Sequence, residues 1–584
     1  MPAPEFEDVA VANGAEAFLA QINANPDVDY IFANTGTDHG PILEALAKMH
    51  RSEAKGAEIL VVPHEQAAVS MAHGYYCASG KPQVVLVHTL PGTANGLGGL
   101  MNAKACQVPM LFVAGRTPVT EGEVPGGKSR HIHWRQESRD QGGIVREFVK
   151  WDFENRANEQ LGAIVPRAFK IAMAEPRGPV YLSLPREWLY EGMESTRVSA
   201  DAFKPPSKIQ TPIADLRQAA EVLLSAADPV IVTRYLGKTP AAVAPLVELA
   251  ELLAIPVVQH PQSPYMNFPS SHPCHAGHDI TAHVKGADVV FLIDIDVPWT
   301  PATRDNLRAE ATVLQLEVDP LFSSIPVWGF PVDHAMTGSS DVTLPVLNGL
   351  IREGLDGSDA PRKSVEARRS RIQAAHDTNR AEIAARIDKV KDERPIHPLW
   401  VSRCIADVVD EKTIVMGEAV TSPLGPVLGL ERPGSFFDQA PAGHLGWGMG
   451  AAIGAKLAAP DHTVIACEGD GSYMFCVPTA CHFTAQKYQV PFLTVIYNNQ
   501  AWNATLSTVR ELYPDGVAHQ TKNFPGTDLT PSPQFELTAQ ACGAYAERVD
   551  DPTDLPAALE RGLKAVKEEG RQALLNVICR NPAG

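Results

Sequence analysis

The sequence lacks several features that would indicate other classes of protein. Its nine cysteines include no Cys-x-x-Cys pair, so a zinc site is not expected, and dispersed thiols are typical of a reducing compartment. No apolar run reaches the length of a membrane span, and Met1 to Ala10 shows no signal-peptide pattern. The net charge is −18 without an extended Lys/Arg patch, which argues against nucleic acid or an anionic membrane as a partner. We therefore expect a soluble cytoplasmic protein.

The chain is long enough, and apolar enough, to form several folded domains. It has 584 residues, of which 45% are hydrophobic and 20% charged, as in globular proteins. A single core does not grow to this size, whereas three domains of about 195 residues each fit the usual range. We therefore look for three separate units along the chain.

Short apolar runs alternate with helical segments in each third of the sequence, a pattern typical of parallel sheets covered by helices on both faces. The polar stretch from 195 to 212 reads as a linker, and the charged stretch from 353 to 395 as a solvated helix and linker, with a binding helix as the alternative. The predicted fold class is α/β, with three doubly wound parallel-sheet domains over residues 1–194, 213–352 and 396–584. The middle unit lacks the Gly-x-Gly-x-x-Gly fingerprint of a dinucleotide site. The predicted strands are 30–33, 59–62, 84–87, 110–113, 180–184, 230–233, 256–259, 289–293, 313–318, 413–416, 463–467, 492–496 and 574–578.

Two polar motifs follow apolar runs in the last third. The sequence Gly469-Asp470-Gly471-Ser472 comes after the run 464–467, and Asn498-Asn499 comes after the run 492–496. Parallel strands end at one edge of a sheet, where open α/β sheets bind ligands. Asp470 and the Asn pair offer the hard oxygens that Mg²⁺ prefers, and the glycines let backbone N–H groups approach a phosphate. Alone, Gly-Asp-Gly is also an ordinary turn.

The paired motifs resemble those of the thiamine diphosphate (ThDP) enzymes that include acetolactate synthase, benzoylformate decarboxylase and pyruvate oxidase. The resemblance implies a pyrimidine-binding, a central and a diphosphate-binding domain, in that order. It assigns Mg²⁺ to Asp470, Asn499 and the carbonyl of Ala501, and the diphosphate to Gly469, Gly471 and Ser472. The alternative is two unrelated strand ends.

A second motif lies far upstream, where the run 58–62 is followed by Pro63-His64-Glu65-Gln66-Ala67-Ala68. We expect a helix to begin near Pro63, with Glu65 in its first turn. ThDP chemistry requires one carboxylate that hydrogen bonds to the aminopyrimidine ring and promotes loss of the C2 proton. The segment resembles the glutamate motif of the family, which gives Glu65 that role. A first-turn Glu that only favours the helix dipole is the alternative.

Three further segments resemble active-site loops of the family. Gly443 would offer its carbonyl to the cofactor amino group, and Leu445 would support the bent cofactor from below, although Leu445 also suits any core. His88, directly after the run 84–87, matches a histidine of benzoylformate decarboxylase that moves protons. Thr37, in Asn34-Thr35-Gly36-Thr37-Asp38-His39, matches a substrate-contacting position. A turn histidine and a helix cap are the respective alternatives.

Polar side chains are concentrated between Gly126 and Gly143, where several cations could hold an anionic substrate. Gln136 resembles a glutamine that acetolactate synthase-like enzymes place near the cofactor; a solvated loop explains the same composition. Trp502, Asn503 and Thr505 are candidates for the substrate pocket, and the following loop to about Pro533 for a lid.

The resemblance implies a lyase or transferase that decarboxylates a 2-oxo acid, through a C2 ylide and an enamine, to give an aldehyde or a carboligation product. A 2-hydroxyacyl lyase that releases no CO₂ and a non-catalytic binding protein are the alternatives. It also implies a homodimer or homotetramer, because in the family the two cofactor-binding domains come from different subunits.

Overall fold

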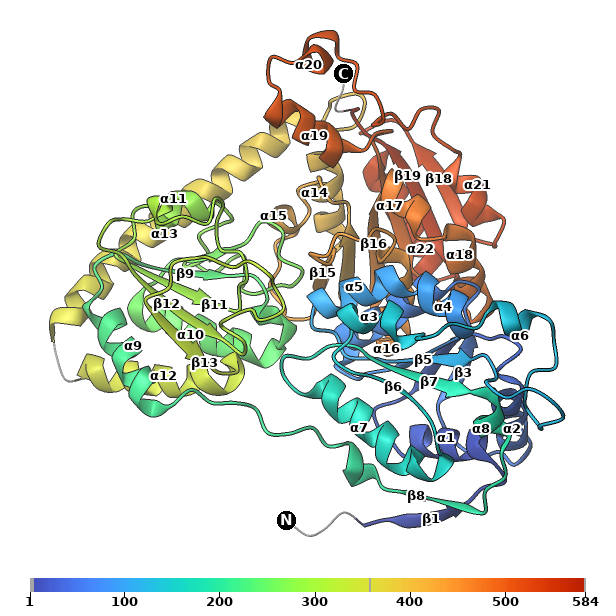
Figure 1. Ribbon diagram of the computed structural model, residues 1–584. Coiled ribbons are helices and arrows are strands. Elements are labelled where there is room, and N and C mark those ends of the chain that lie inside the picture. The colour runs from blue at the N-terminus through green and yellow to red at the C-terminus, as the bar shows by residue number, and fades with distance from the viewer. Residues whose placement is uncertain (1–4, 357–358, 582–584) are drawn as a thin grey trace.

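A computed structural model describes residues 5–356 and 359–581 and contains three parallel β-sheets with helices on both faces (Figure 1). The predicted fold class is therefore confirmed. The sheet orders are β3-β2-β4-β5-β7-β6, β10-β9-β11-β12-β13 and β15-β14-β16-β17-β19-β18. All pairings inside these sheets are parallel, and the apolar runs found in the sequence form their central strands.

The first sheet consists of β2 (Tyr30–Asn34), β3 (Glu58–Val61), β4 (Val84–Val87), β5 (Leu111–Arg116), β6 (Asp152–Glu154) and β7 (Val180–Pro185). Its longer helices are α1 (Gly14–Asn23), α2 (Gly40–Arg51), α3 (Glu65–Ser79), α5 (Leu97–Ala105) and α7 (Leu161–Met173), with the shorter α4 (Thr89–Asn95), α6 (Ile132–Arg135) and α8 (Arg186–Tyr190). Every residue of β4, β5 and β7 is buried, which explains their unbroken apolar sequences.

The central sheet consists of β9 (Pro229–Thr233), β10 (Val257–Gln259), β11 (Val289–Ile293), β12 (Thr312–Glu317) and β13 (His334–Thr337). It is flanked by α9 (Ile213–Ser225), α10 (Val243–Leu253), α11 (Ile280–Val284) and α12 (Ser340–Asp356). The charged stretch forms the long helix α13 (Asp359–Val390), which runs across this unit (Figure 1), so the expected solvated helix is present.

The last sheet consists of β14 (Thr413–Glu418), β15 (Phe436–Asp438), β16 (Thr463–Gly469), β17 (Leu493–Asn498), β18 (Tyr545–Val549) and β19 (Ala573–Ile578). Its helices are α14 (Pro398–Val408), α15 (Gly425–Leu428), α16 (Gly448–Ala458), α17 (Asp470–Phe475), α18 (Pro478–Lys487), α19 (Asn503–Leu512), α20 (Val517–Thr521), α21 (Phe535–Gln540) and α22 (Leu555–Lys567).

Two local expectations were wrong. The stretch 195–212 is not only a linker, because β8 (Ser195–Val198) pairs antiparallel with β1 (Glu7–Ala10). The segment after Trp502 is not simply a long loop, because it folds into α19 and α20. The helix expected near Pro63 is present with Glu65 in its first turn; it begins at Glu65, after the N-cap His64, whose side chain accepts a hydrogen bond from the Gln66 N–H.

The first and last units pack on each other through α3 and α16, which lie between their sheets (Figure 1). Small residues allow the two helices to approach closely. A Cβ atom on Gly74 would lie 2.0 Å from the Ala451 carbonyl oxygen, and one on Gly454 would lie 1.9 Å from that of Met71. No helix within residues 5–356 and 359–581 is both long and apolar enough to cross a membrane.

Candidate active site

Asp470 stands at the point where β16 ends and α17 begins, and its side chain is 3% exposed. Burial raises the pKa of its carboxyl group to about 6, against the opposing effect of hydrogen bonds from backbone N–H groups that include those of Gly471 and Gln500. Its second oxygen, Oδ2, is buried and has no hydrogen-bond partner among the described residues. A buried carboxylate of this kind is stabilised by a bound cation.

The two asparagines at the carboxyl end of β17 have different roles: Asn498 is the last residue of the strand, and Asn499 follows it. Asn498 is fully buried, and its Nδ2 donates to Asn576 Oδ1 at 2.9 Å and to Ser532 Oγ at 2.8 Å. It therefore ties β17 to β19. The Oδ1 of Asn499 accepts the N–H of Ala501 at 3.0 Å, which closes a tight turn and leaves that amide oxygen a second lone pair.

A cavity of about 380 Å³ opens at this edge of the last sheet. Trp502 also faces it and packs against the backbone of Gly471, where a Cβ atom would lie 2.2 Å from the indole ring. The structure thus brings all the residues expected to hold the diphosphate, the metal and the cofactor bend around one space. The expected residues that line it are Gly443, Leu445, Gly469, Asp470, Gly471, Ser472, Asn499 and Ala501.

A buried acidic pair supports the loop that carries Gly443 and Leu445. Glu418, the last residue of β14, accepts the backbone N–H groups of Gly446, Trp447 and Gly448 at 2.8–2.9 Å. These donors lie just before and at the start of α16, where a negative charge is favoured. Gly443 itself has φ = +74°, in the left-handed region that glycine enters without strain.

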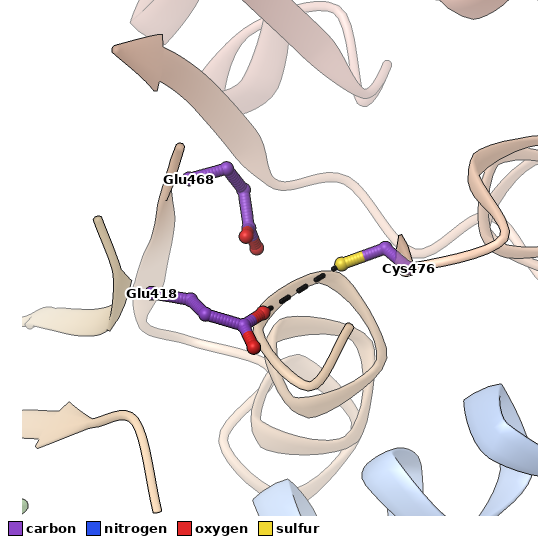
Figure 2. A group of neighbouring side chains, drawn as sticks. All are labelled: Glu418, Glu468 and Cys476. Atoms are coloured by element: carbon purple, nitrogen blue, oxygen red, sulfur yellow. Dashed lines mark hydrogen bonds between the residues drawn. The ribbon is translucent and has the colours of Figure 1, made fainter. Parts of the chain in front are cut away.

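The second member of the pair, Glu468, is completely buried, and Figure 2 shows its carboxyl group directed toward Glu418. Ligand atoms of Glu418, Glu468 and Cys476 lie within 4.8 Å of one another. Burial and the neighbouring carboxylate hold the pKa of Glu468 well above its usual range, while burial raises that of Glu418 to about 7 against its three backbone hydrogen bonds. One neutral and one ionised carboxyl group satisfy this geometry, with the negative charge on Glu418.

Glu65 lies at the edge of the first sheet and is 5% exposed. Asn34, at the end of β2, donates its Nδ2 to Glu65 Oε1 at 2.9 Å. Asn95, at the end of α4, donates to Glu65 Oε2 at 3.2 Å. Two neutral amides from different elements therefore fix this carboxylate without an ion pair.

His88 follows β4 on the same edge and hydrogen bonds to Asp38. Its Nδ1 contacts Asp38 Oδ1, and its Nε2 lies 3.1 Å from Gln136 Nε2. The hydrogen bond to Asp38 raises the pKa of His88 above its usual value, although burial opposes the shift. The imidazole is thus fixed on one side by a carboxylate and on the other by an amide.

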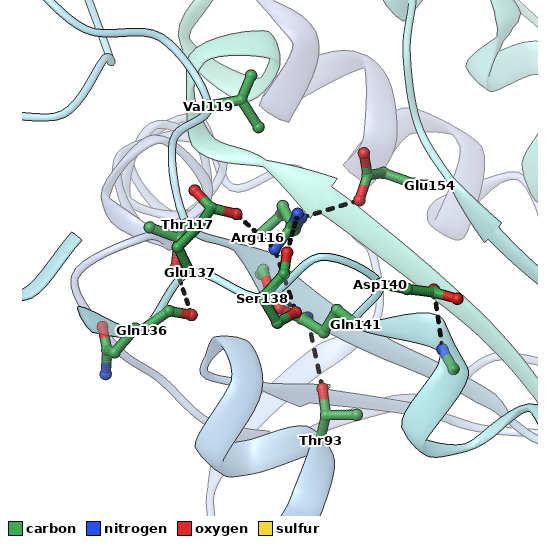
Figure 3. A network of polar contacts seen from close by, with 12 residues as sticks. Thr93, Arg116, Thr117, Val119, Gln136, Glu137, Ser138, Asp140, Gln141 and Glu154 are labelled. Carbon is green, nitrogen blue, oxygen red and sulfur yellow. Dashed lines mark hydrogen bonds and ion pairs between the residues drawn. The ribbon is translucent and has the colours of Figure 1, made fainter. Parts of the chain in front are cut away.

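An anchored loop carries Gln136 to this position. Arg116, the last residue of β5, pairs with Glu137 and Glu154 at 2.9 Å each and donates to the Ser138 carbonyl at 2.8 Å (Figure 3). Gln141 then donates to the Gly115 carbonyl at 2.9 Å. The segment from 137 to 141 is therefore a built part of the site and not simply a solvated loop.

The cations between Gly126 and Gly143 divide into two groups. Lys128 forms an ion pair with Glu137 at 2.6 Å, so its charge is neutralised within the segment. Arg130, Arg135 and Arg139 are exposed. Thr37 is also exposed, on the connection between β2 and α2, so the structure places it at the rim of the His88 cluster.

Within one chain these residues form two clusters. Glu65, His88 and Thr37 do not line the cavity that contains Asp470. Each cluster is nonetheless complete at its own sheet edge. Any reaction that uses both must therefore bring two such edges together.

Several residues of the site were not identified from the sequence. Glu418 and Glu468 carried a readable signal, because each is a carboxylate at the end of an otherwise apolar strand. The amides of Asn34 and Asn95 had no such signal, since their partner Glu65 is about 30 positions away and only the fold brings them together.

Comparison with known proteins agrees with this geometry. Residues 12–144 match the model of the thiamine pyrophosphate enzyme N-terminal TPP-binding domain, 216–338 that of the central domain and 421–577 that of the C-terminal TPP-binding domain. The chain belongs to the thiamine pyrophosphate enzyme family. Thiamine pyrophosphate is another name for ThDP, so the resemblance read from the sequence is confirmed.

Relatives in this family have different activities. Benzoylformate decarboxylase of Pseudomonas aeruginosa is 27% identical, over 92% of this chain and 94% of its own length. The large subunit of acetolactate synthase isozyme 3 of Escherichia coli is 25% identical, over 95% of this chain and 93% of its own. Sulfoacetaldehyde acetyltransferase of Alcaligenes xylosoxydans is also 25% identical, over 100% and 94%.

The fold matches solved structures of the family over its whole length. A ThDP-dependent 4-hydroxybenzoylformate decarboxylase of Rhodococcus jostii superposes with a TM-score of 0.78 at 22% identity, covering 98% of this chain and 100% of that one. The residues present here also fit the cofactor. The buried, unpartnered oxygen of Asp470 suits a cation, and Gly469, Gly471 and Ser472 line the same cavity.

Proposed function

We propose that this protein is a ThDP- and Mg²⁺-dependent decarboxylase of a 2-oxo acid that releases CO₂ and an aldehyde. The observation that carries the proposal is the His88 imidazole, fixed between Asp38 and Gln136 on the sheet edge that also carries Glu65. A decarboxylase needs a proton donor at the carbon that loses its carboxylate, and an imidazole is suited to this near neutral pH.

The diphosphate half of the site holds the cofactor in this proposal. Asp470, the Asn499 side chain and the Ala501 carbonyl hold Mg²⁺, and Gly469, Gly471 and Ser472 face the diphosphate. Gly443 and Leu445 set the position of the rings. When bound, ThDP supplies a carbon nucleophile for the substrate carbonyl and accepts the electron pair released with CO₂.

The other half handles protons. Glu65 hydrogen bonds to the pyrimidine ring and holds the proton exchanged there, while Asn34 and Asn95 fix its orientation. His88 Nε2 exchanges a proton with the substrate. Gln136 and Thr37 contact the substrate. Cations of the segment around Gln136 attract the substrate carboxylate.

The complete site is proposed to form between two copies of the chain. The support is the separation of the two clusters, since Glu65 and His88 do not line the cavity of Asp470 within one chain. A homodimer is the smallest assembly that unites them, and a homotetramer contains two such pairs.

The test is CO₂ release from a panel of aromatic and aliphatic 2-oxo acids, with the full chain reconstituted with ThDP and Mg²⁺ and the products identified by NMR. We expect CO₂ and an equimolar aldehyde with at least one acid. A hydroxyketone product would replace the decarboxylase assignment with carboligation. Bound cofactor with no CO₂ release from any acid would contradict the proposed reaction.

A further inference from the structure

A carboxylate that the cofactor assignment does not use lies beneath His88. Asp38 is 2% exposed and lies between two imidazoles. Its Oδ1 contacts His88 Nδ1, and its Oδ2 lies 3.2 Å from His39 Nε2. An isolated ionised carboxylate is costly to bury, so this arrangement calls for an explanation.

The backbone is shaped to admit this carboxylate. A Cβ atom on Gly115, in β5, would lie 1.2 Å from Asp38 Oδ2, and one on Gly36 would lie 2.1 Å from His88 Nδ1. Any other residue at either position would displace the pair. Two glycines from separate elements thus keep open the space that Asp38 and His88 occupy.

His39 fixes the charge state of the arrangement. It is fully buried, and its Nδ1 accepts the backbone N–H of Gly36 at 3.1 Å, so the neutral ring carries its proton on Nε2, facing Asp38. Burial lowers the pKa of His39 and so favours the neutral ring, although the charge of Asp38 opposes this shift. The carboxylate therefore faces one neutral N–H and one ring that is free to change charge.

We propose that Asp38 is a positioning residue that holds the His88 ring with Nδ1–H toward its carboxylate, so that Nε2 is the atom that delivers a proton to the substrate. This inference rests on the proposed decarboxylation and assigns the source of its proton. The Nε2–H bond breaks and its electron pair stays on nitrogen, while the proton forms the new C–H bond of the aldehyde. The ring then recovers a proton from solvent, so a 2-oxo acid anion and one proton give an aldehyde and CO₂.

The charges around His88 agree with this role. Burial acts to raise the pKa of Asp38, whereas the hydrogen bond to His88 and the charge of that ring act to lower it. Asp38 and, more weakly, Glu65 favour the protonated form of His88. Because an amide nitrogen only donates, Gln136 Nε2 donates to His88 Nε2 in the neutral ring, and the amide turns its oxygen toward Nε2 when that nitrogen is protonated. Arg186 and His133 interact with Asp38 at longer range.

The test is Asp38→Asn in the full chain with ThDP and Mg²⁺. An amide can donate to Nδ1 and so favours the opposite tautomer, with the ring neutral. We expect kcat to fall by roughly 10- to 100-fold with little change in KM. Because the acid form of His88 is the active one, the alkaline limb of the kcat profile should move to lower pH. Asp27→Asn, on the exposed surface of the same domain, is the matched control and should change neither.

Two further measurements keep the inference testable if the variant is inactive or unstable. Adding Asp38→Asn to His88→Ala should cost nothing beyond His88→Ala alone, because Asp38 acts only through that ring. In the wild-type protein, ¹⁵N-histidine NMR, assigned with His88→Ala, should show a proton retained on His88 Nδ1 at neutral pH.

The outcomes separate this inference from the proposed reaction. A His88 resonance without a proton on Nδ1, or one that titrates at the same pH in wild type and Asp38→Asn, would overturn the role of Asp38. If Asp38→Asn changes that resonance but no 2-oxo acid releases CO₂, the coupling between Asp38 and His88 is supported and only the proposed decarboxylation is contradicted.

Discussion

The first and last sheets share one topology but present different chemistry at the same edge. Their orders, β3-β2-β4-β5-β7-β6 and β15-β14-β16-β17-β19-β18, become identical when β2 is matched with β14 and each later strand with its counterpart. In this match His88, which follows β4, corresponds to Asp470, which follows β16. Arg116, at the end of β5, corresponds to Asn498, at the end of β17.

The two edges differ in the groups that surround their buried carboxylates. The Asp470 edge gathers carboxylates whose pKa values burial raises, to about 6 for Asp470 and about 7 for Asp438, and so it favours a cation. The Glu65 edge instead places neutral amides around Glu65 and two imidazoles beside Asp38. In the proposed function, one architecture therefore serves as a cation site in the last domain and as a proton-transfer site in the first.

The largest expected effect comes from removing the acid at the first edge. Glu65→Gln keeps the shape but cannot hold the pyrimidine proton, so turnover should fall by about 10²- to 10⁴-fold while ThDP still binds. Steady-state kinetics and calorimetry together measure this. Glu58→Gln, exposed at the start of β3, should behave as wild type. Retained turnover in Glu65→Gln would refute the assignment.

Removing the acid at the second edge should instead abolish binding. Asp470→Ala deletes the carboxylate that faces the proposed Mg²⁺, and we expect affinity for Mg²⁺ and ThDP to fall by at least about 100-fold. Titration calorimetry checks this, with Asp461→Ala, on the surface of the same domain, as control. Normal affinity in Asp470→Ala would mean that the two edges do not differ in the way proposed.

A pH series sharpens the comparison without mutation. The proposed cation requires ionised Asp470, and burial raises the pKa of that group to about 6 in the unliganded protein. Affinity for Mg²⁺ with ThDP should therefore be constant above this pH and weaken below it, by up to about tenfold per pH unit. Calorimetry from pH 5 to 8 would show the transition, and an affinity independent of pH would contradict it.

The smallest effect concerns the support of the second edge. Glu418→Gln replaces an ionised acceptor of three N–H groups by a neutral amide, and should cost about 1–3 kcal/mol. We expect a melting temperature lower by roughly 2–4 °C for each kcal/mol lost, and weaker ThDP binding. Glu411→Gln, on the surface nearby, is the control for differential scanning fluorimetry. An unchanged melting temperature would show that Glu418 is not needed to hold the loop.

Much of this arrangement could be predicted from the sequence, and the reason lies in its strands. Central strands such as β4 and β11 are buried on both faces, so their apolar runs mark them with the bounds observed. Edge strands such as β6, β15 and β18 are short or half-exposed and left no comparable pattern. The motifs around Asp470 and Glu65 could be found because each is a short run of small and polar residues that closely follows an apolar run.

The partners of those motifs could not be found in the same way. Asp38 was noted beside Thr37, yet its contact with His88 spans 50 positions and depends on the space left by Gly115. Glu418 and Glu468 each stand at the end of an apolar strand, but the contact between them could not be predicted because it forms only across the sheet. Packing between elements, which local patterns do not encode, decides these contacts.

The anchoring of the segment after Arg116 has a consequence for altering this enzyme. Arg116 and Gln141 hold residues 137–141 from inside the domain, whereas Arg130, Ile132 and Trp134 project from the exposed part of the same segment. Variation can therefore be confined to the exposed positions of 130–135, with buried His133 kept because its Nδ1 accepts the backbone N–H groups of Ser129 and Arg130. In the proposed function, a library at those exposed positions changes the surface beside the His88 cluster while Gln136 stays next to His88, which makes them a starting point for directed evolution of substrate range.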